Sequence, residues 1–146
     1  MNVNKLDIKT FENSETMNTS LGQFSEDIVN FIIDKKPEFL GRLTPNKDVL
    51  FWKSRIKHTE NHKKDFKSEE EFYKCFEDIP KILADPDYIS IHPKDESVSF
   101  IKQYTEKVSV AIKISSDGKM VYRTMYPLDE SQLETYIKNN RAWKYK

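Results

Sequence analysis

The hydrophobic positions of the chain change their spacing partway along the sequence. In the first half they recur at three- and four-residue steps, the repeat of a helix with one buried face. One such helix is expected after Ser25, a residue type that favours helix N-termini, and ends or bends at Pro37. A second is expected over residues 68–84, with Pro80 marking a kink or an earlier end near Asp78.

Beyond residue 87 the period becomes two, which is typical of strands with one buried face. The expected strands cover residues 88–92, 97–104, 108–114 and 119–126, and a short apolar run at 49–52 is also of strand type. Asp117-Gly118 predicts a tight hairpin turn, Pro127 ends the last strand, and residues 131–137 predict a short helix. The pattern therefore predicts an α+β fold: an N-terminal helical region, then a small antiparallel sheet of about four strands and a short C-terminal helix.

The length of 146 residues fits one domain. Residues 1–23 are polar and are expected to form an N-terminal arm, with residues 24–146 as a single α+β domain. Within the arm, the alternation of Leu6 and Ile8 permits either a short edge strand or a loosely held segment. The sequence thus favours one core with an appended arm.

Composition excludes several classes of protein. Basic and acidic residues balance at 24 each, so any contact with nucleic acid must rest on a local patch. Cys75 is the single cysteine, which rules out a disulfide within the chain and indicates a reducing compartment. No apolar leader and no stretch of membrane-spanning length is present, so a cytoplasmic protein with no membrane partner is the simplest expectation.

The most basic segment, residues 53–67, contains Lys57, His58 and His62. If it is helical, the two histidines share one face, and together with Lys57 they offer a proton acceptor, a proton donor and a cation for RNA cleavage. A solvated basic turn is the plainer interpretation. Zinc is the third, but no Glu completes an H-E-x-x-H arrangement and no cysteine is near, so we expect no metal and no cofactor.

A second group of candidates lies at the end of a strand, in Tyr122-Arg123-Thr124-Met125-Tyr126-Pro127. Regular alternation places Tyr122, Thr124 and Tyr126 on one face, and Arg123 on the other with Val121 and Met125. A cation among apolar neighbours needs an anion nearby, which is either a carboxylate of the protein or a bound phosphate.

His92 and Lys94 follow another expected strand and could face the same cleft, although a plain polar loop is the favoured interpretation. Trp143, near the end of the chain, could pack against RNA or complete the core, and the core role is favoured.

Three stretches together resemble the phage-associated branch of the barnase/EndoU/colicin/RelE-like nuclease superfamily, the PBECR-type domains of prophage proteins and toxins. They are Arg55-Ile56-Lys57-His58 through His62 and Phe66, then residues 79–89 (IPKILADPDYI), then residues 122–127 (YRTMYP). The resemblance covers residues 48–146.

This resemblance implies a metal-independent endoribonuclease acting on RNA, with tRNA among the candidate targets, by transesterification. It implies catalytic roles for His58, His62, Arg123 and Tyr126. It also places Lys57 and Thr124 at the site as substrate-binding residues, to which His92 and Lys94 are added from their position after a strand.

Two other classes of function remain open from the sequence. One is a non-catalytic, prophage-encoded module that binds a host or phage protein, and the other is an RNA-binding protein that does not cleave. A free nuclease would in turn call for an immunity partner or a restricted target. The relative placement of His58 and Arg123 discriminates between these classes, because cleavage requires both at one site.

Overall fold

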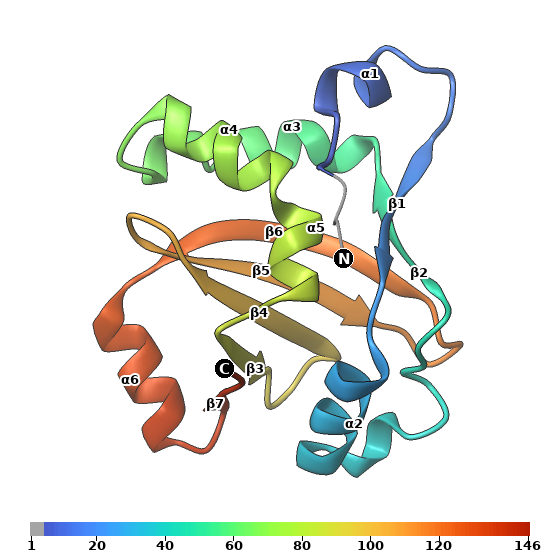
Figure 1. Cartoon of the computed structure of the whole chain (residues 1–146), viewed down its shortest axis with the longest axis vertical. Helices are drawn as coiled ribbons and strands as arrows, with labels where there is room; N and C mark the ends of the chain where they lie inside the picture. Colours follow the sequence, from blue (N-terminus) through green and yellow to red (C-terminus); the bar gives the residue numbers. More distant parts are fainter. Residues whose placement is uncertain (1–4) are drawn as a thin grey trace.

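The computed structural model describes residues 5–146 and is built around one seven-stranded mixed sheet (Figure 1). The strand order is β1-β2-β6-β5-β4-β3-β7. The expected α+β arrangement of about four antiparallel strands preceded by helices is therefore wrong in its strand number, its strand directions and the distribution of its helices. Residues 1–4 of the expected N-terminal arm lie outside the described residues.

The central strands form where the alternating pattern predicts them. They are β3 (Tyr88–Ile91), β4 (Ser97–Gln103), β5 (Lys107–Ile114) and β6 (Met120–Leu128), joined as an antiparallel meander. Gly118 adopts a φ of 87° in the β5–β6 turn, a value that glycine reaches without strain. Pro127 does not end β6, because it still pairs with Val108 at the margin of the ladder.

Three further strands flank this meander. β1 (Asn18–Gln23) is antiparallel to β2 (Asp48–Trp52), and β2 runs parallel to β6 through the pairs Val49–Met120 and Leu50–Val121. β7 (Ala142–Lys144) is antiparallel to β3. Neither β1 nor β7 carries a clear alternating pattern, so both owe their strand conformation to pairing with segments far away in the sequence.

Helices are interspersed with the strands along the whole chain. They are α1 (Ile8–Glu12), α2 (Glu26–Lys35), η1 (Pro37–Phe39), α3 (Ser54–Glu60), η2 (Lys63–Asp65), α4 (Glu69–Glu77), α5 (Ile79–Ala84) and α6 (Glu130–Lys138). The segment of Leu6 and Ile8, considered above as an edge strand, instead leads into helix α1. A helical region that precedes the sheet is thus replaced by helices that alternate with strands.

Local capping signals act as the sequence predicts. The side chains of Ser25 and Ser68 accept backbone hydrogen bonds at the starts of α2 and α4. The expected break near Asp78 is confirmed, since α4 ends at Glu77 and α5 begins at Ile79 with Pro80 in its first turn. The Asp78 carboxylate, largely buried at this corner, accepts a hydrogen bond from the Tyr104 hydroxyl at 3.0 Å.

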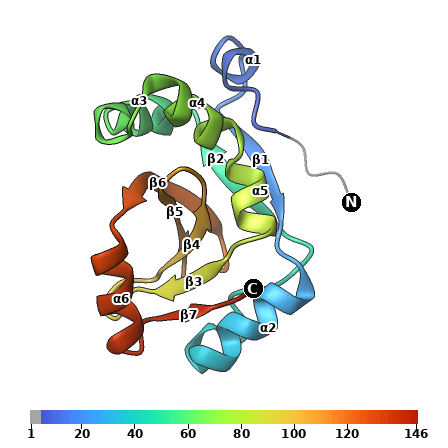
Figure 2. The same cartoon turned by 60° about the vertical axis from the view of Figure 1, so that its left-hand side comes forward.

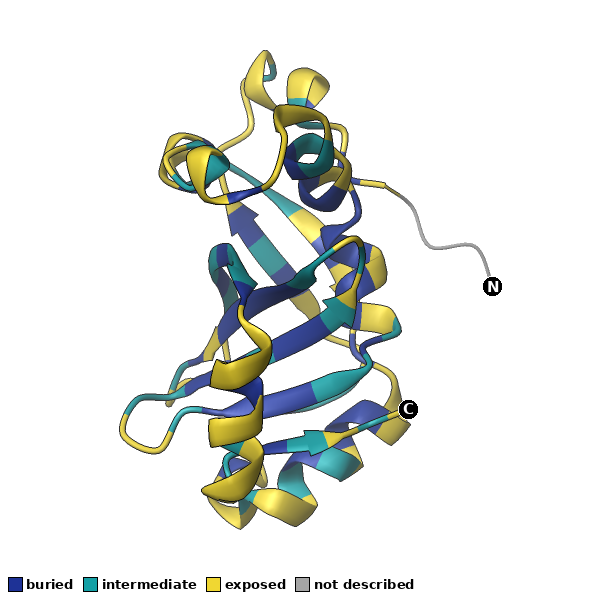
Figure 3. Ribbon diagram, turned by 90° about the vertical axis from the view of Figure 1, so that its left-hand side faces the viewer, coloured by how far each residue is buried: buried dark blue, intermediate teal, exposed yellow. Residues whose placement is uncertain are grey.

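Two apolar clusters lie on opposite faces of the sheet. The larger contains Phe51, Phe76, Phe100 and Tyr122 and is covered by α5 and its neighbours. The smaller contains Leu128 and Leu133 together with Ile101 and Ala142, and it lies under α6. Figure 2 shows α5 and α6 on the two sides of the sheet, and Figure 3 shows the buried centre of the strands between exposed helical surfaces. Among the described helices, none has the length and apolar character required to cross a membrane.

Candidate active site

Helix α3 presents a basic face next to β6. Ile56 and Thr59 are buried on its inner side, while Lys57 and His58 are exposed on its outer side. The hydroxyls of Thr59 and Tyr122 lie 2.6 Å apart, and both side chains are fully buried. This hydrogen bond joins α3 to β6, so the orientation of the basic face is set relative to the strand.

Three basic side chains of α3 and its C-terminal extension share one face. Arg55, His58 and His62 follow one another at steps of three and four residues. The helix ends at Glu60, with Asn61 as its C-cap, but His62 keeps a near-helical backbone with φ −91° and ψ −1°. The ring centroids of the two histidines are therefore only 5.7 Å apart.

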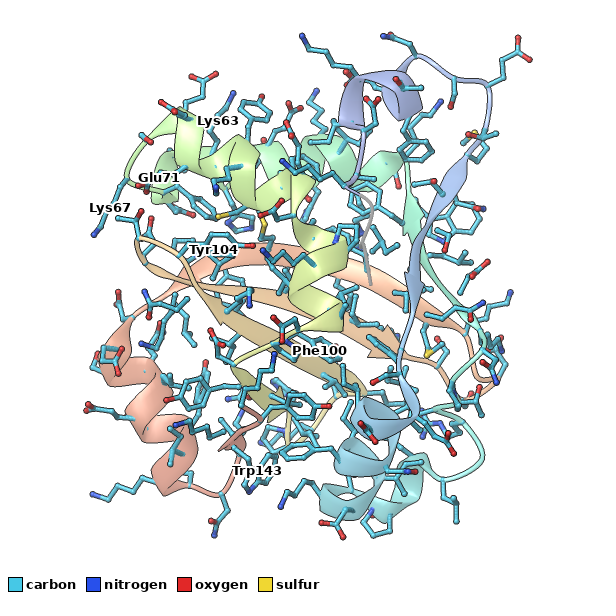
Figure 4. The ribbon with its side chains drawn as sticks, viewed as in Figure 1. Lys63, Lys67, Glu71, Phe100, Tyr104 and Trp143 are labelled. Atoms are coloured by element: carbon cyan, nitrogen blue, oxygen red, sulfur yellow. The ribbon has the colours of Figure 1, made fainter. Side chains whose placement is uncertain are left out.

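A carboxylate orients His62. Its Nδ1 lies 3.1 Å from Oδ2 of Asp65. With Nδ1 engaged, Nε2 is the ring nitrogen left to exchange a proton with a substrate. Hydrogen bonds also hold the following turn. Lys63 (labelled in Figure 4) donates one to the Tyr73 hydroxyl, and this hydroxyl donates one to the Glu60 carboxylate of α3.

On the strand side, Arg123 occupies a β-bulge. Tyr122 pairs with Ile112 and Thr124 with Ala111, so Arg123 has no partner on β5. The extra residue disrupts the alternation assumed from the sequence, and Tyr122 and Met125 both belong to the main core. The expected separation of Tyr122 from Met125 on opposite faces is therefore wrong.

Electrostatics link the two elements. The pKa of His58 lies below its ordinary value of 6.5, first because of partial burial and then because of the positive charges of Arg55, His62 and Arg123. Arg123 on β6 is thus close enough to act on His58 of α3. We call Arg55, His58, His62 and Arg123 the α3–β6 site.

The cations of this site are not neutralised from within the protein. Across residues 5–146, neither Arg55 nor Arg123 forms an ion pair with a carboxylate. Arg42, by contrast, is paired with Glu96. Two unpaired guanidinium groups beside a histidine held toward its neutral form are suited to an anionic ligand that exchanges protons.

Three more of the candidate residues belong to α3 or β6. Lys57 is exposed on α3, at a helical position outside the face shared by Arg55, His58 and His62. Thr124 is half-buried, and its Oγ1 has no hydrogen-bond partner in the described part of the chain. Tyr126 packs instead in the smaller cluster with Tyr136, and burial there raises the pKa of its hydroxyl. The structure thus brings His58, His62 and Arg123 together and places Tyr126 on the α6 side of the sheet.

His92 and Lys94 lie in the β3–β4 loop, away from α3. Nδ1 of His92 accepts hydrogen bonds from the backbone N–H groups of Lys94, at 3.1 Å, and of Asp95, at 3.0 Å. The Asp95 carboxylate, 3.5 Å from this nitrogen, accepts a hydrogen bond from the backbone N–H of Ser97. His92 shapes the loop and lines a cavity at the ends of α2 and α6.

The sequence interpretation did not single out Arg55. Its spacing from His58 and His62 was the available signal, since all three positions fall on one helical face. Within residues 5–146, no three His, Cys, Asp or Glu side chains are grouped as a metal site would require.

Comparison with known proteins gives one result, a match to a family model that covers most of the chain. The model of the family described as "phage-Barnase-EndoU-ColicinE5/D-RelE like nuclease3" matches residues 27–135. This range includes the complete α3–β6 site and excludes strands β1 and β7. No curated protein and no solved structure matched the chain.

Proposed function

The chain belongs to this family of phage-associated nucleases, and from that membership we propose that it is a metal-independent endoribonuclease acting at the α3–β6 site. The proposal is supported by the packing of α3 against β6, across which the charge of Arg123 lowers the pKa of His58. General acid–base cleavage of RNA needs titratable groups near neutral pH and cations for the developing negative charge. The α3–β6 site supplies both kinds of group.

The proposed reaction is a transesterification. His58, whose lowered pKa favours the neutral imidazole, accepts the proton of a ribose 2′-hydroxyl. The 2′-oxygen forms a bond to phosphorus, and the bond from phosphorus to the 5′-oxygen breaks. Protonated His62, oriented by Asp65, donates its proton to the departing 5′-oxygen. The products are a 2′,3′-cyclic phosphate and a 5′-hydroxyl.

Arg123 and Arg55 stabilise the charge that builds up on the phosphoryl oxygens. Both are free of carboxylate partners within residues 5–146, so a phosphate group meets no internal competitor. Lys57, exposed on the same helix as Arg55, adds a contact to RNA that extends past the site. Tyr126 lies among the residues of the α6 side and is left without a role in this scheme.

The substrate class is RNA, with tRNA as the first candidate, and a toxin-like role in phage biology follows from such an activity. A protein that cleaves cellular RNA requires restraint, for which an immunity partner that covers the α3–β6 site is the simplest arrangement.

The test is incubation of the purified protein with total tRNA in excess EDTA, beside His58→Ala, His62→Ala and Arg123→Ala. We expect discrete cleavage that survives EDTA, ends in a cyclic phosphate and falls by roughly 100-fold or more when either histidine is removed. Lys81→Ala is the matched control, because this lysine is exposed on α5 outside the site.

Three results would count against the proposal. RNA that stays intact with the unmodified protein, but is still bound, would indicate an RNA-binding module. RNA that is neither bound nor cleaved would favour a module that binds a host or phage protein. Cleavage lost in EDTA and restored by a divalent cation would remove metal independence.

A further inference from the structure

A second cationic site lies away from the α3–β6 site, at the ends of α2 and α6. It is a cavity of about 580 Å3, a volume in the range that holds small ligands. Its walls come from three separate parts of the chain: the last residues of α2, the residues after α6 and the His92 loop. Lys35, Lys36, His92, Tyr136, Arg141 and Trp143 line it.

The charges around the cavity are unequal. Lys35, Lys36 and Arg141 contribute three positive charges, and Glu38 is the acidic residue of its lining. Lys35 is partly engaged by Asp34 at 3.8 Å, an exposed carboxylate. The cavity therefore favours a ligand that carries negative charge.

Arg141 is held in place with part of its hydrogen-bonding capacity unused. Its guanidinium carbon lies 4.0 Å from the centroid of the Tyr136 ring. Its Nε is buried and has no hydrogen-bond partner within residues 5–146. The guanidinium forms no ion pair with a carboxylate within residues 5–146, so its positive charge is available to an anionic ligand in the cavity.

The cavity also has an aromatic wall. Trp143 is half-buried and is fixed by the pairing of β7 with β3, opposite Ile89. Figure 4 shows Trp143 between α6 and α2. The Lys35 ammonium lies over this ring, 5.6 Å from its centroid, so one face of the flat apolar surface already carries a cation. Nucleobases stack on such surfaces.

The remaining lining offers groups that match the edge of a base. Asn139 and Asn140 follow α6, and their amides can both donate and accept hydrogen bonds. Charge, stacking surface and amides thus match different parts of one nucleotide.

We propose that this α2–α6 cavity binds one nucleotide of the RNA substrate, with its base against Trp143 and its phosphate near Lys36 and Arg141. The inference rests on the proposed function for its ligand, but it concerns a site remote in the chain from the α3–β6 residues. An acidic peptide would satisfy the cations and leave the tryptophan surface and the asparagine amides unused.

The experiment follows the fluorescence of Trp143. The chain has two tryptophans, so Trp52→Phe leaves Trp143 as the single reporter. We expect nucleoside monophosphates to change this fluorescence saturably, and a 2′-O-methyl oligoribonucleotide, which cannot be cleaved, to bind more tightly than any of them. Nucleosides and inorganic phosphate, which each supply one half of the ligand, should bind at least about fivefold more weakly than the nucleotide.

Variants separate the two contacts. In the Trp52→Phe protein, Lys36→Ala and Arg141→Gln should each weaken nucleotide binding, whereas Lys81→Ala should leave it unchanged. With a labelled oligonucleotide, Trp143→Ala should weaken binding about fivefold or more and Trp143→Phe should retain most of it, because a stacking ring remains. Circular dichroism and thermal unfolding verify that each variant is folded.

Several outcomes would overturn the proposal: no saturable response to any nucleotide, equal binding of phosphate alone, or preference for an acidic peptide over the oligonucleotide. Each leaves RNA cleavage by the α3–β6 site untouched. Conversely, His58→Ala should abolish cleavage and preserve the Trp143 response, so failure of the proposed function and failure of this inference are distinguishable.

Discussion

At the scale of single residues, the lowered pKa of His58 is the property that bears most directly on the proposed chemistry. Its pKa is lowered by burial and by the positive charges of Arg55, His62 and Arg123, so the neutral imidazole is favoured near neutral pH. A proton acceptor must be neutral before it can act, and this one stays neutral to a lower pH than an isolated histidine would.

We therefore predict that an NMR titration of His58 gives a midpoint below 6.5, and that Arg123→Gln moves the midpoint upward. Removing a nearby positive charge makes protonation easier, which raises the pKa. The midpoint should remain below 6.5 in the variant, because burial is the largest cause of the shift and is retained. A midpoint that does not change with Arg123→Gln, as expected for Lys81→Gln, would mean that Arg123 and His58 act at separate places.

At the scale of elements, the α3–β6 site depends on one buried hydrogen bond. The hydroxyls of Thr59 and Tyr122 are 2.6 Å apart and fully enclosed, and they connect the helix that carries the histidines to the strand that carries Arg123.

We predict that Tyr122→Phe lowers the free energy of unfolding by about 1–3 kcal/mol, because the Thr59 hydroxyl is left buried without its partner. Chemical denaturation measures this loss. The double variant Tyr122→Phe/Thr59→Val removes both polar groups, so it should lose less than the two single variants lose together. Strict additivity would show that the two hydroxyls are not coupled.

The elements that the sequence predicted are those whose signal is local. Ser25 and Ser68 mark helix starts by their own side chains, and strands β4 and β5 follow from alternating burial. β1 and β7 were not expected because their conformation comes from pairing with remote strands. The parallel contact between β2 and β6 joins segments about 70 residues apart, and no local pattern encodes such a pairing.

The α3–β6 site was predictable only in part, because only some of its residues are related by local spacing. The spacing of His58 and His62 on a helix is local and was visible, and Arg55 could have been added by the same argument. Tyr126 was grouped with Tyr122 by strict alternation, whereas the bulge at Arg123 shifts the register and directs Tyr126 to the smaller cluster. A bulge residue reverses the side of the sheet to which each later side chain of the strand points. Whether a bulge forms depends on the pairing with the neighbouring strand.

At the scale of the whole molecule, the sheet extends beyond the segment that matches the nuclease family. The match begins at residue 27, yet Leu21 of β1 is only 3% exposed and belongs to the main core. We predict that Leu21→Ala lowers the free energy of unfolding by about 2–5 kcal/mol. Met17→Ala, at a position 63% exposed, should change it by less than about 0.5 kcal/mol. Equal stabilities in a denaturant series would show that β1 is not part of the cooperative unit.

Charge is the other property of the whole molecule that constrains function. The formal net charge is zero, so RNA is not attracted by the protein as a whole and affinity depends on the few cations that touch phosphates. If Arg55, Lys57 and Arg123 each contact one phosphate, as proposed, the logarithm of affinity should fall with the logarithm of salt concentration at a slope of about −2 for single-stranded RNA.

The α2–α6 cavity makes this slope depend on the length of the RNA. An oligonucleotide too short to reach both sites should show the slope of about −2, whereas a longer one that also contacts Lys36 and Arg141 should approach about −3.5. Filter binding of non-cleavable 2′-O-methyl oligonucleotides over a range of salt concentrations measures both values. In a Lys36→Ala/Arg141→Gln protein the long oligonucleotide should return to the slope of the short one. If the slope is the same for all lengths in the unmodified protein, the two cationic sites do not share one RNA molecule, and the cavity serves a ligand other than the cleaved strand.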